Sequence, residues 1–196
     1  MNPRLATAIA NAKRGALSKT SIESAIAKGQ GKSVSGAALE TVIIEAMLPS
    51  SVAAIIECQT DQKARVLQDI RYIINKHGGA VTPTNYLFEK KGRIVFQKKE
   101  GISADDILDE AVEAGALDVD TDDDQIIVDT HPSEVSAVAQ KIVEAFGFSI
   151  ERSSIVHVPK PETTVSVEDK DAEVVENVIN LLEEDPSVQD VYINAV

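Results

Sequence analysis

The chain has 196 residues, of which 43% are hydrophobic, so it can build apolar cores and is not an intrinsically disordered protein. Aromatic residues make up only 4%, and we therefore expect cores of Val, Ile, Leu and Ala. The formal charge is −13. The single cysteine excludes an intramolecular disulfide and fits a reducing compartment, and the absence of any run of 18 apolar residues predicts that the chain has no membrane span.

The negative charge lies in the part of the chain after residue 32. The first 32 residues contain six basic side chains and one acidic one, whereas residues 33–196 contain 13 basic and 31 acidic side chains. The six bases are Arg4, Lys13, Arg14, Lys19, Lys28 and Lys32. This asymmetry predicts a contact with a polyanion that is confined to the basic segment. The alternative is a solvated basic helix face that has no partner.

Two short helices are predicted at the start of the chain, over residues 3–15 and 21–28. In the second helix, Thr20 and Glu23 have the spacing of a capping box, and Gly29 is a typical residue to end a helix. The composition of residues 29–37 predicts a flexible linker. Two helices of this length bury little apolar surface alone, so we expect them to pack on the rest of the protein, on another chain or on further sequence.

After residue 40 the pattern changes to strands and helices that form a split α/β domain. We predict strands at 41–47 and 52–58, helices at 61–76 and 171–183, and a last strand at 188–193. The helices are recognised by apolar residues at helical spacing, such as Val66, Ile70 and Ile74.

The residues between the two halves of this domain read as an insertion. We predict a strand at 92–98, a helix at 103–114, a hairpin of 116–121 and 125–129, a helix at 133–145 and a strand at 149–158. This β-α-β-β-α-β order is the ferredoxin-like one. The fold class is therefore α+β: a helical domain at 1–38 and two ferredoxin-like α/β domains, one at 39–84 plus 159–196 and one inserted at 85–158.

The sequence shows no catalytic or cofactor motif. The histidines His77, His131 and His157 have no metal-ligand spacing, and nucleotide-binding glycine motifs and a nucleophile elbow are absent. The acidic run 118–124 starts like a calcium loop, but Asp123 stands where that loop needs Gly. We predict a non-enzymatic protein with no cofactor and no metal.

A second basic patch lies in the insertion. It comprises Lys90, Lys91, Arg93, Lys98 and Lys99. One interpretation is a nucleic-acid contact, and the other is protection of an edge strand by lysine. The segment 91–96 begins like an RNA-binding strand, but its stacking positions are aliphatic or charged, so base stacking there is not expected.

Several segments, taken together, resemble the YebC family, which includes the mitochondrial translational activator of cytochrome c oxidase subunit I. The matching segments are NPRL (2–5), SIESAIAKGQG (21–31), ETVIIEAMLPSSVAAIIECQTDQKAR (40–65), KHGG (76–79), YLFEKKGRIVF (86–96), EAGALDV (113–119) and SVQDVYIN (187–194). The resemblance covers essentially the whole chain in order.

The resemblance implies three domains, of which the third is inserted into the second, and a role in transcription or in translation on the ribosome, without catalysis. The chain departs from the family in two places. The family's basic opening stretch and a further helix before NPRL are missing, so the helical domain is expected to be truncated. The family's Gly-Pro-Gly-Gly turn is Leu48-Pro49-Ser50-Ser51.

These observations lead to one main hypothesis for function. The chain is a monomeric translation factor that acts on the mitochondrial ribosome or its messages in the matrix, with ribosomal RNA or mRNA as its partner. Its phosphate contacts are the six bases of residues 1–32, with Arg65 and Arg71 as secondary contacts. The alternatives are a DNA-binding transcriptional regulator, which would be cytoplasmic in a bacterium, and a protein-interaction adaptor with an acidic docking surface.

Overall fold

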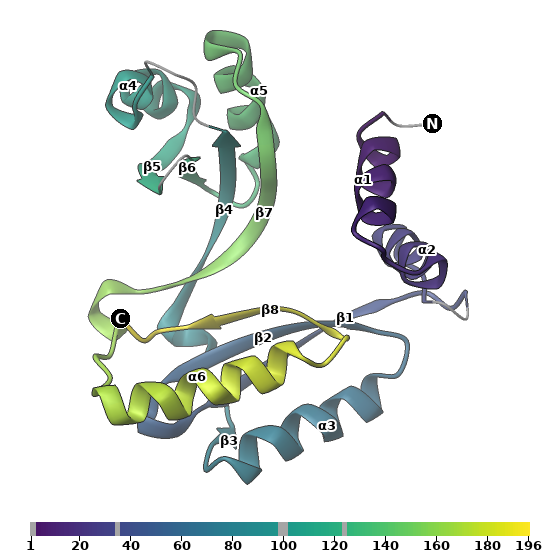
Figure 1. Cartoon of the computed structure of the whole chain (residues 1–196). Helices are drawn as coiled ribbons and strands as arrows, with labels where there is room; N and C mark the ends of the chain where they lie inside the picture. Colours follow the sequence, from purple (N-terminus) through teal and green to yellow (C-terminus); the bar gives the residue numbers. More distant parts are fainter. Residues whose placement is uncertain (1–2, 34–35, 98–101, 123–124) are drawn as a thin grey trace. The chain divides into compact units, whose positions relative to one another are not determined.

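The computed structural model describes residues 3–33, 36–97, 102–122 and 125–196, apart from the side chains at 3, 4, 6–8, 11 and 169. The described residues confirm the α+β fold class, with strands in two sheets and helices packed on them (Figure 1). They divide into two compact units, Met1–Thr82 with Glu168–Val191 and Pro83–Val167 with Tyr192–Val196. The three-domain division stays a prediction.

The first unit contains a sheet with the strand order β3-β1-β2-β8. Its elements after the N-terminal helices are β1 (Glu40–Met47), the 3-10 helix η1 (Pro49–Ser51), β2 (Ala53–Thr60), α3 (Lys63–Lys76), β3 (Ala80–Val81), α6 (Asp169–Glu183) and β8 (Val188–Ile193). β1 pairs antiparallel with both β2 and β3. The order differs from the ferredoxin-like one, although the architecture of helices on an antiparallel sheet is shared.

The core of this unit follows the predicted apolar periodicity. Along β1, Val42, Ile44 and Ala46 are buried in alternation, as expected for a strand with one face on the core. α3 buries the stripe Val66, Ile70 and Ile74, and α6 buries Val175, Val178 and Leu182. α3 and α6 contact one another and run over the same sheet (Figure 1).

The second unit has the strand order β5-β6-β4-β7, which is that of a ferredoxin-like sheet. Its elements are η2 (Asn85–Leu87), β4 (Phe88–Gln97), α4 (Ala104–Ala114), β5 (Ala116–Asp122), β6 (Gln125–Thr130), α5 (Val135–Phe146), β7 (Ile150–Pro159) and η3 (Pro161–Thr163). All adjacent strands are antiparallel. Ile94 and Phe96 of β4 face α4 and α5 and join one apolar core with Ile107 and Ile142.

Local signals set the helix ends in this unit. Asp106 accepts hydrogen bonds from the backbone N–H and the hydroxyl of Ser103, at 2.8 and 2.7 Å, which fixes the start of α4. Gly115 (φ 112°) and Gly147 (φ 63°) end α4 and α5 in the left-handed conformation, which glycine adopts without a Cβ clash. These caps explain why the helix boundaries agree closely with those predicted.

Candidate nucleic-acid surface

The six first-ranked bases belong to a pair of helices, α1 (Pro3–Arg14) and α2 (Lys19–Gly29), and to the turn after them. We call this pair the basic hairpin. The N-cap of α2 is Ser18, whose hydroxyl accepts from the backbone N–H of Ser21 at 3.0 Å. The capping box predicted at Thr20 and Glu23 is therefore wrong, because the Ser18 hydroxyl provides the same acceptor two residues earlier and lets the helix start at Lys19.

The end of α2 also differs from the prediction. Gly29 is still helical, and Gly31 is the residue with positive φ (70°). The backbone N–H of Gly31 donates to the Lys28 carbonyl at 2.8 Å, and that of Lys32 donates to the Ala27 carbonyl at 2.9 Å. These two bonds form a Schellman motif, which fixes where Lys32 leaves the helix. Lys32 then pairs as a bridge with Ala38, and residues 34–35 of the predicted linker lie outside the described residues.

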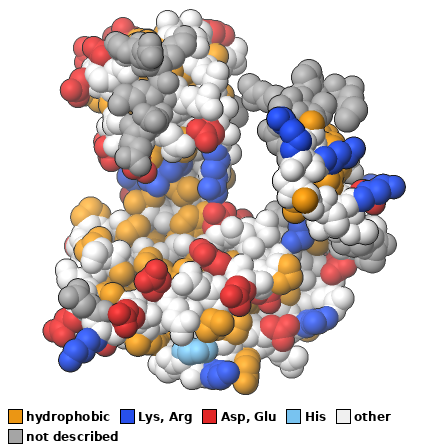
Figure 2. Space-filling view, in the orientation of Figure 1, with side chains coloured by type: hydrophobic (Ala, Val, Ile, Leu, Met, Phe, Trp, Pro, Cys, Tyr) orange, Lys and Arg blue, Asp and Glu red, His pale blue; other side chains and the backbone are white. Residues whose placement is uncertain are grey.

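The structure leaves the hairpin bases accessible. Lys13, Arg14, Lys19 and Lys32 are exposed and Lys28 is half-buried, whereas the side chain of Arg4 lies outside the described residues. Figure 2 shows Lys and Arg side chains over this region with hydrophobic side chains between them. The acid of the segment, Glu23, pairs with Lys19 at 3.7 Å, and both are well exposed, so the pair is weak and a phosphate can replace the carboxylate.

The apolar faces of α1 and α2 line an open groove of about 410 Å³. Leu5, Ile9 and Ala12 contribute from α1, and Ile22 and Ile26 from α2. None of the described α2 residues is buried. The basic hairpin thus has one apolar face, and its described basic side chains lie outside that face. Such an exposed apolar face is expected for two helices that bury little surface by themselves.

The secondary bases Arg65 and Arg71 are both exposed on α3. Arg65 Nε lies 3.5 Å from the Asp69 carboxylate, and Arg65 lines a polar cavity of about 260 Å³ with Pro186. The Lys28 ammonium donates a hydrogen bond to the Pro186 carbonyl. The structure therefore brings Lys28 to the margin of the cavity that Arg65 lines.

Sequence reasoning missed Tyr72, which lies on α3 between the exposed bases. Tyr72 is 65% exposed, and the Lys76 ammonium lies over its ring at 5.8 Å from the centroid. The signal was available, because the buried stripe of Val66, Ile70 and Ile74 places Tyr72 on the opposite side of the helix. The prediction ranked charge alone and so did not include an aromatic ring.

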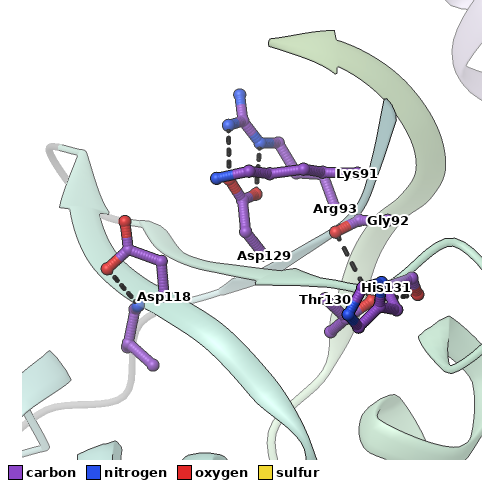
Figure 3. A network of polar contacts seen from close by, with 8 residues as sticks. Lys91, Gly92, Arg93, Asp118, Asp129, Thr130 and His131 are labelled. Atoms are coloured by element: carbon purple, nitrogen blue, oxygen red, sulfur yellow. Dashed lines mark hydrogen bonds and ion pairs between the residues drawn. The ribbon is translucent and has the colours of Figure 1, made fainter. Parts of the chain in front are cut away.

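Two of the five bases of the second basic patch, Lys91 and Arg93, pair with one buried carboxylate (Figure 3). The Arg93 guanidinium donates to both carboxylate oxygens of Asp129, at 2.8 and 2.9 Å, and Lys91 Nζ lies 3.9 Å from the same carboxylate. Asp129 is buried, and its hydrogen bond raises the pKa of Arg93. The edge-protection interpretation is wrong, because β4 lies between β6 and β7. Lys98 and Lys99 lie outside the described residues.

The acidic strand β5 shows local contacts. Asp118 and Asp120 each accept a hydrogen bond from the next backbone N–H, at 3.0 and 2.7 Å (Figure 3 for Asp118). Within the described ranges, no group of three potential metal-ligating side chains lies together. No helix in the described part of the chain has the length and apolarity needed to cross a membrane.

Comparisons with known proteins test whether this chain belongs to the family that its sequence resembles. A family model described as the TACO1/YebC second and third domain matches residues 39–195. Probable transcriptional regulatory proteins of Pseudothermotoga lettingae and Clostridioides difficile are 36% and 35% identical to this chain, each over 98% of it and over 76% and 81% of their own lengths.

A solved structure extends the similarity to the fold. The crystal structure of a conserved hypothetical protein from Aquifex aeolicus is 36% identical, with a TM-score of 0.74 over 100% of this chain and 80% of that one. These relatives are bacterial, and the predicted closeness to the mitochondrial activator stays a prediction. The match over residues 39–195, together with this identity over almost the whole chain, establishes that the protein belongs to the TACO1/YebC family.

Proposed function

We propose that the protein regulates gene expression by binding RNA through the basic hairpin, as a translation factor on the ribosome or its messages. The observation that carries the proposal is the accessible charge of the hairpin: the described bases are exposed or half-buried, and Glu23 is the one acid of the segment. The rest of the chain has a net charge of −18, from 13 bases and 31 acids, so as a whole it repels phosphate and makes the hairpin the favoured contact for a duplex.

The salt dependence of RNA binding tests this proposal. If all six first-ranked bases contact duplex phosphates, the logarithm of the affinity should fall against the logarithm of the salt concentration with a slope of roughly −5. A variant with Arg4, Lys13, Arg14, Lys19, Lys28 and Lys32 changed to Gln should bind weakly and have a slope near zero. Fluorescence anisotropy with a labelled stem-loop RNA measures both the affinity and its salt dependence.

A control separates the hairpin from the rest of the chain. Changing Lys141, Lys160 and Lys170 to Gln removes positive charge from the acidic part and should leave the slope and the RNA affinity within about twofold, since screened charges outside the contact matter little. A slope near zero for the unchanged protein would rule out the electrostatic proposal.

A second candidate is a DNA-binding transcriptional regulator. It is favoured by the names of the relatives, which are called probable transcriptional regulatory proteins. It requires base-reading side chains on a helix in the major groove, and α2 offers Thr20, Ser21, Glu23 and Ser24 as its polar residues besides lysines. Competition between a structured RNA and a DNA duplex of equal charge distinguishes the two, because RNA should compete more strongly if the first proposal holds.

The bacterial relatives bear on where this function takes place. They support the cytoplasm over the mitochondrial matrix for this chain. We further propose that the protein acts as a monomer and without catalysis, through the placement of its charged surfaces. Sedimentation of the full chain at micromolar concentration checks the oligomeric state, and a dimer would contradict it.

A further inference from the structure

α3 is a basic helix in the acidic part of the chain. Within 14 residues it carries four of the 13 bases and one of the 31 acids of residues 33–196. Its bases are Lys63, Arg65, Arg71 and Lys76. The neighbouring helix α6, which lies beside α3 over the same sheet (Figure 1), carries five acids and one base. A polyanion is therefore attracted to α3 and repelled by α6.

Three of these bases, Arg65, Arg71 and Lys76, share an exposed face of α3 with side chains that can contact nucleobases. Ile70 faces the sheet, and Tyr72 lies about 200° further around the helix, so its ring points away from the core. The exposed residues of this face are Arg65, Gln68, Asp69, Arg71, Tyr72, Asn75 and Lys76. Two of them, Gln68 and Asn75, have amide groups that both donate and accept hydrogen bonds, as base edges require.

Tyr72 provides a flat apolar surface at the centre of this face. Its exposure is 65% in a chain whose aromatic content is only 4%. The Lys76 ammonium, at 5.8 Å from the ring centroid, orients the ring by a cation–π interaction. Unpaired bases stack on such rings, whereas bases inside a duplex are already stacked on one another and do not reach a side chain on a helix surface.

We propose that the exposed face of α3 binds single-stranded RNA, with a base stacked on Tyr72 and phosphates on Arg65, Arg71 and Lys76. The choice of RNA rests on the proposed function, but the site is distinct from the basic hairpin. The pair of Arg65 and Asp69 is compatible with this role. Both side chains are at least half exposed and 3.5 Å apart, so the carboxylate holds Arg65 weakly and a phosphate can replace it.

The test compares substitutions of Tyr72 in the full chain. With an oligouridine of about 12 nucleotides as the probe, Tyr72→Ala should lose roughly 5- to 150-fold in affinity, which is the range for loss of one base–aromatic stack. Tyr72→Phe keeps the ring and should stay within about twofold of the parent. Tyr86→Ala is the matched control, because Tyr86 is 66% exposed and belongs to η2, which has no basic residue.

Tyrosine fluorescence gives a second readout. The chain contains three tyrosines and no tryptophan, so its emission comes from tyrosine alone. Stacking of a base should quench part of this emission in the parent protein and in Tyr86→Ala. The quenching should disappear in Tyr72→Phe although this variant still binds, which a merely structural role for Tyr72 does not predict.

Three results would overturn the inference. Tyr72→Ala could bind oligouridine as well as the parent, Tyr72→Phe could lose as much affinity as Tyr72→Ala, or Tyr72→Ala could weaken a base-paired RNA by the same factor as oligouridine. The six-site hairpin variant separates this inference from the proposed function. If that variant keeps the oligouridine binding that Tyr72→Ala loses, the α3 site stands, and the hairpin proposal fails only if the variant also keeps its affinity for structured RNA. If the hairpin variant loses oligouridine binding and Tyr72→Ala keeps it, the α3 site alone is rejected.

Discussion

At Gly92 the backbone of β4 approaches α5 more closely than a side chain allows. A Cβ at this position would lie 2.0 Å from Val135 Cγ2 and 2.5 Å from Thr130 Oγ1. Thr130 is held in place by its hydroxyl, which donates to the His131 carbonyl at 2.9 Å (Figure 3). Gly92 therefore sets the spacing between the sheet and α5.

We predict that Gly92→Ala lowers the free energy of unfolding of the second unit by about 1–3 kcal/mol, the usual cost of overpacking. Urea denaturation measures this. Gly29→Ala is the control, because no atom lies within 4 Å of a Cβ there and the residue is helical, so stability should be unchanged or slightly higher. The double variant Gly92→Ala, Val135→Ala should recover part of the loss; no recovery would show that the contact with Val135 is not the cause.

Among the elements, the turn between β1 and β2 holds two residues in an unfavourable conformation. Ser50 and Ser51 have φ values of 59° and 61°, in the left-handed region that costs non-glycine residues about 1 kcal/mol each. The turn is kept because the Leu48 backbone N–H donates to the Val52 carbonyl at 2.7 Å and the flanking strands pair in full register. In the family pattern, glycines stand at both positions.

We predict that Ser50→Gly, Ser51→Gly raises the free energy of unfolding by about 0.5–1 kcal/mol, since relief of backbone strain exceeds the added entropy of the unfolded chain. Thermal denaturation of the double variant measures the change. Ser153→Gly is the matched control, because Ser153 is exposed in the extended strand β7 and glycine there should reduce stability. A double variant less stable than the parent would contradict the strain argument.

The elements also show what the sequence could predict. β8 has the predicted bounds and α6 starts two residues early, because apolar periodicity over a whole element identifies it. β3, of two residues, was missed because so short a strand has no period, and it is defined only by its pairing with Ala46 and Met47. Tyr72 was missed as a candidate site residue for another reason, since the periodicity of α3 placed its ring on the exposed side but the prediction ranked charge alone.

On the scale of the whole molecule, the single cysteine can be used to follow folding, because its burial and its pKa differ between the folded and unfolded chain. Cys58 in β2 is fully buried, and burial, followed by the nearby carboxylates of Asp185 and Glu57, raises the pKa of its thiol from 9.0 to about 12. In the folded protein the thiol stays protonated, whereas in the unfolded chain it ionises above about pH 8.5. This linkage leaves stability unaffected at neutral pH and lowers it as the pH rises from about 9 toward 12.

We predict two measurable results for Cys58. A thiol reagent at pH 8 should label it only in denaturant, because the thiolate is the reactive form and the sulfur is buried. The free energy of unfolding should fall by up to about 1.4 kcal/mol per pH unit above pH 9 in the parent, relative to Cys58→Ala measured in parallel. Rapid labelling of the native protein, or equal slopes for the two proteins, would contradict the prediction.

The pairing at the base of β4 and β7 has a consequence for the order of folding. Phe88 pairs with Pro159, and the Lys160 backbone N–H donates to the Leu87 carbonyl at 3.0 Å, so the two ends of the intervening segment meet once that segment has folded. Closing a flexible loop of roughly 70 residues costs about 4 kcal/mol in chain entropy. A segment that folds first removes this cost from the packing of α6 on α3 and the pairing of β8 with β2. Refolding kinetics should therefore show protection of Cys58 only after the ends at Leu87 and Lys160 have closed.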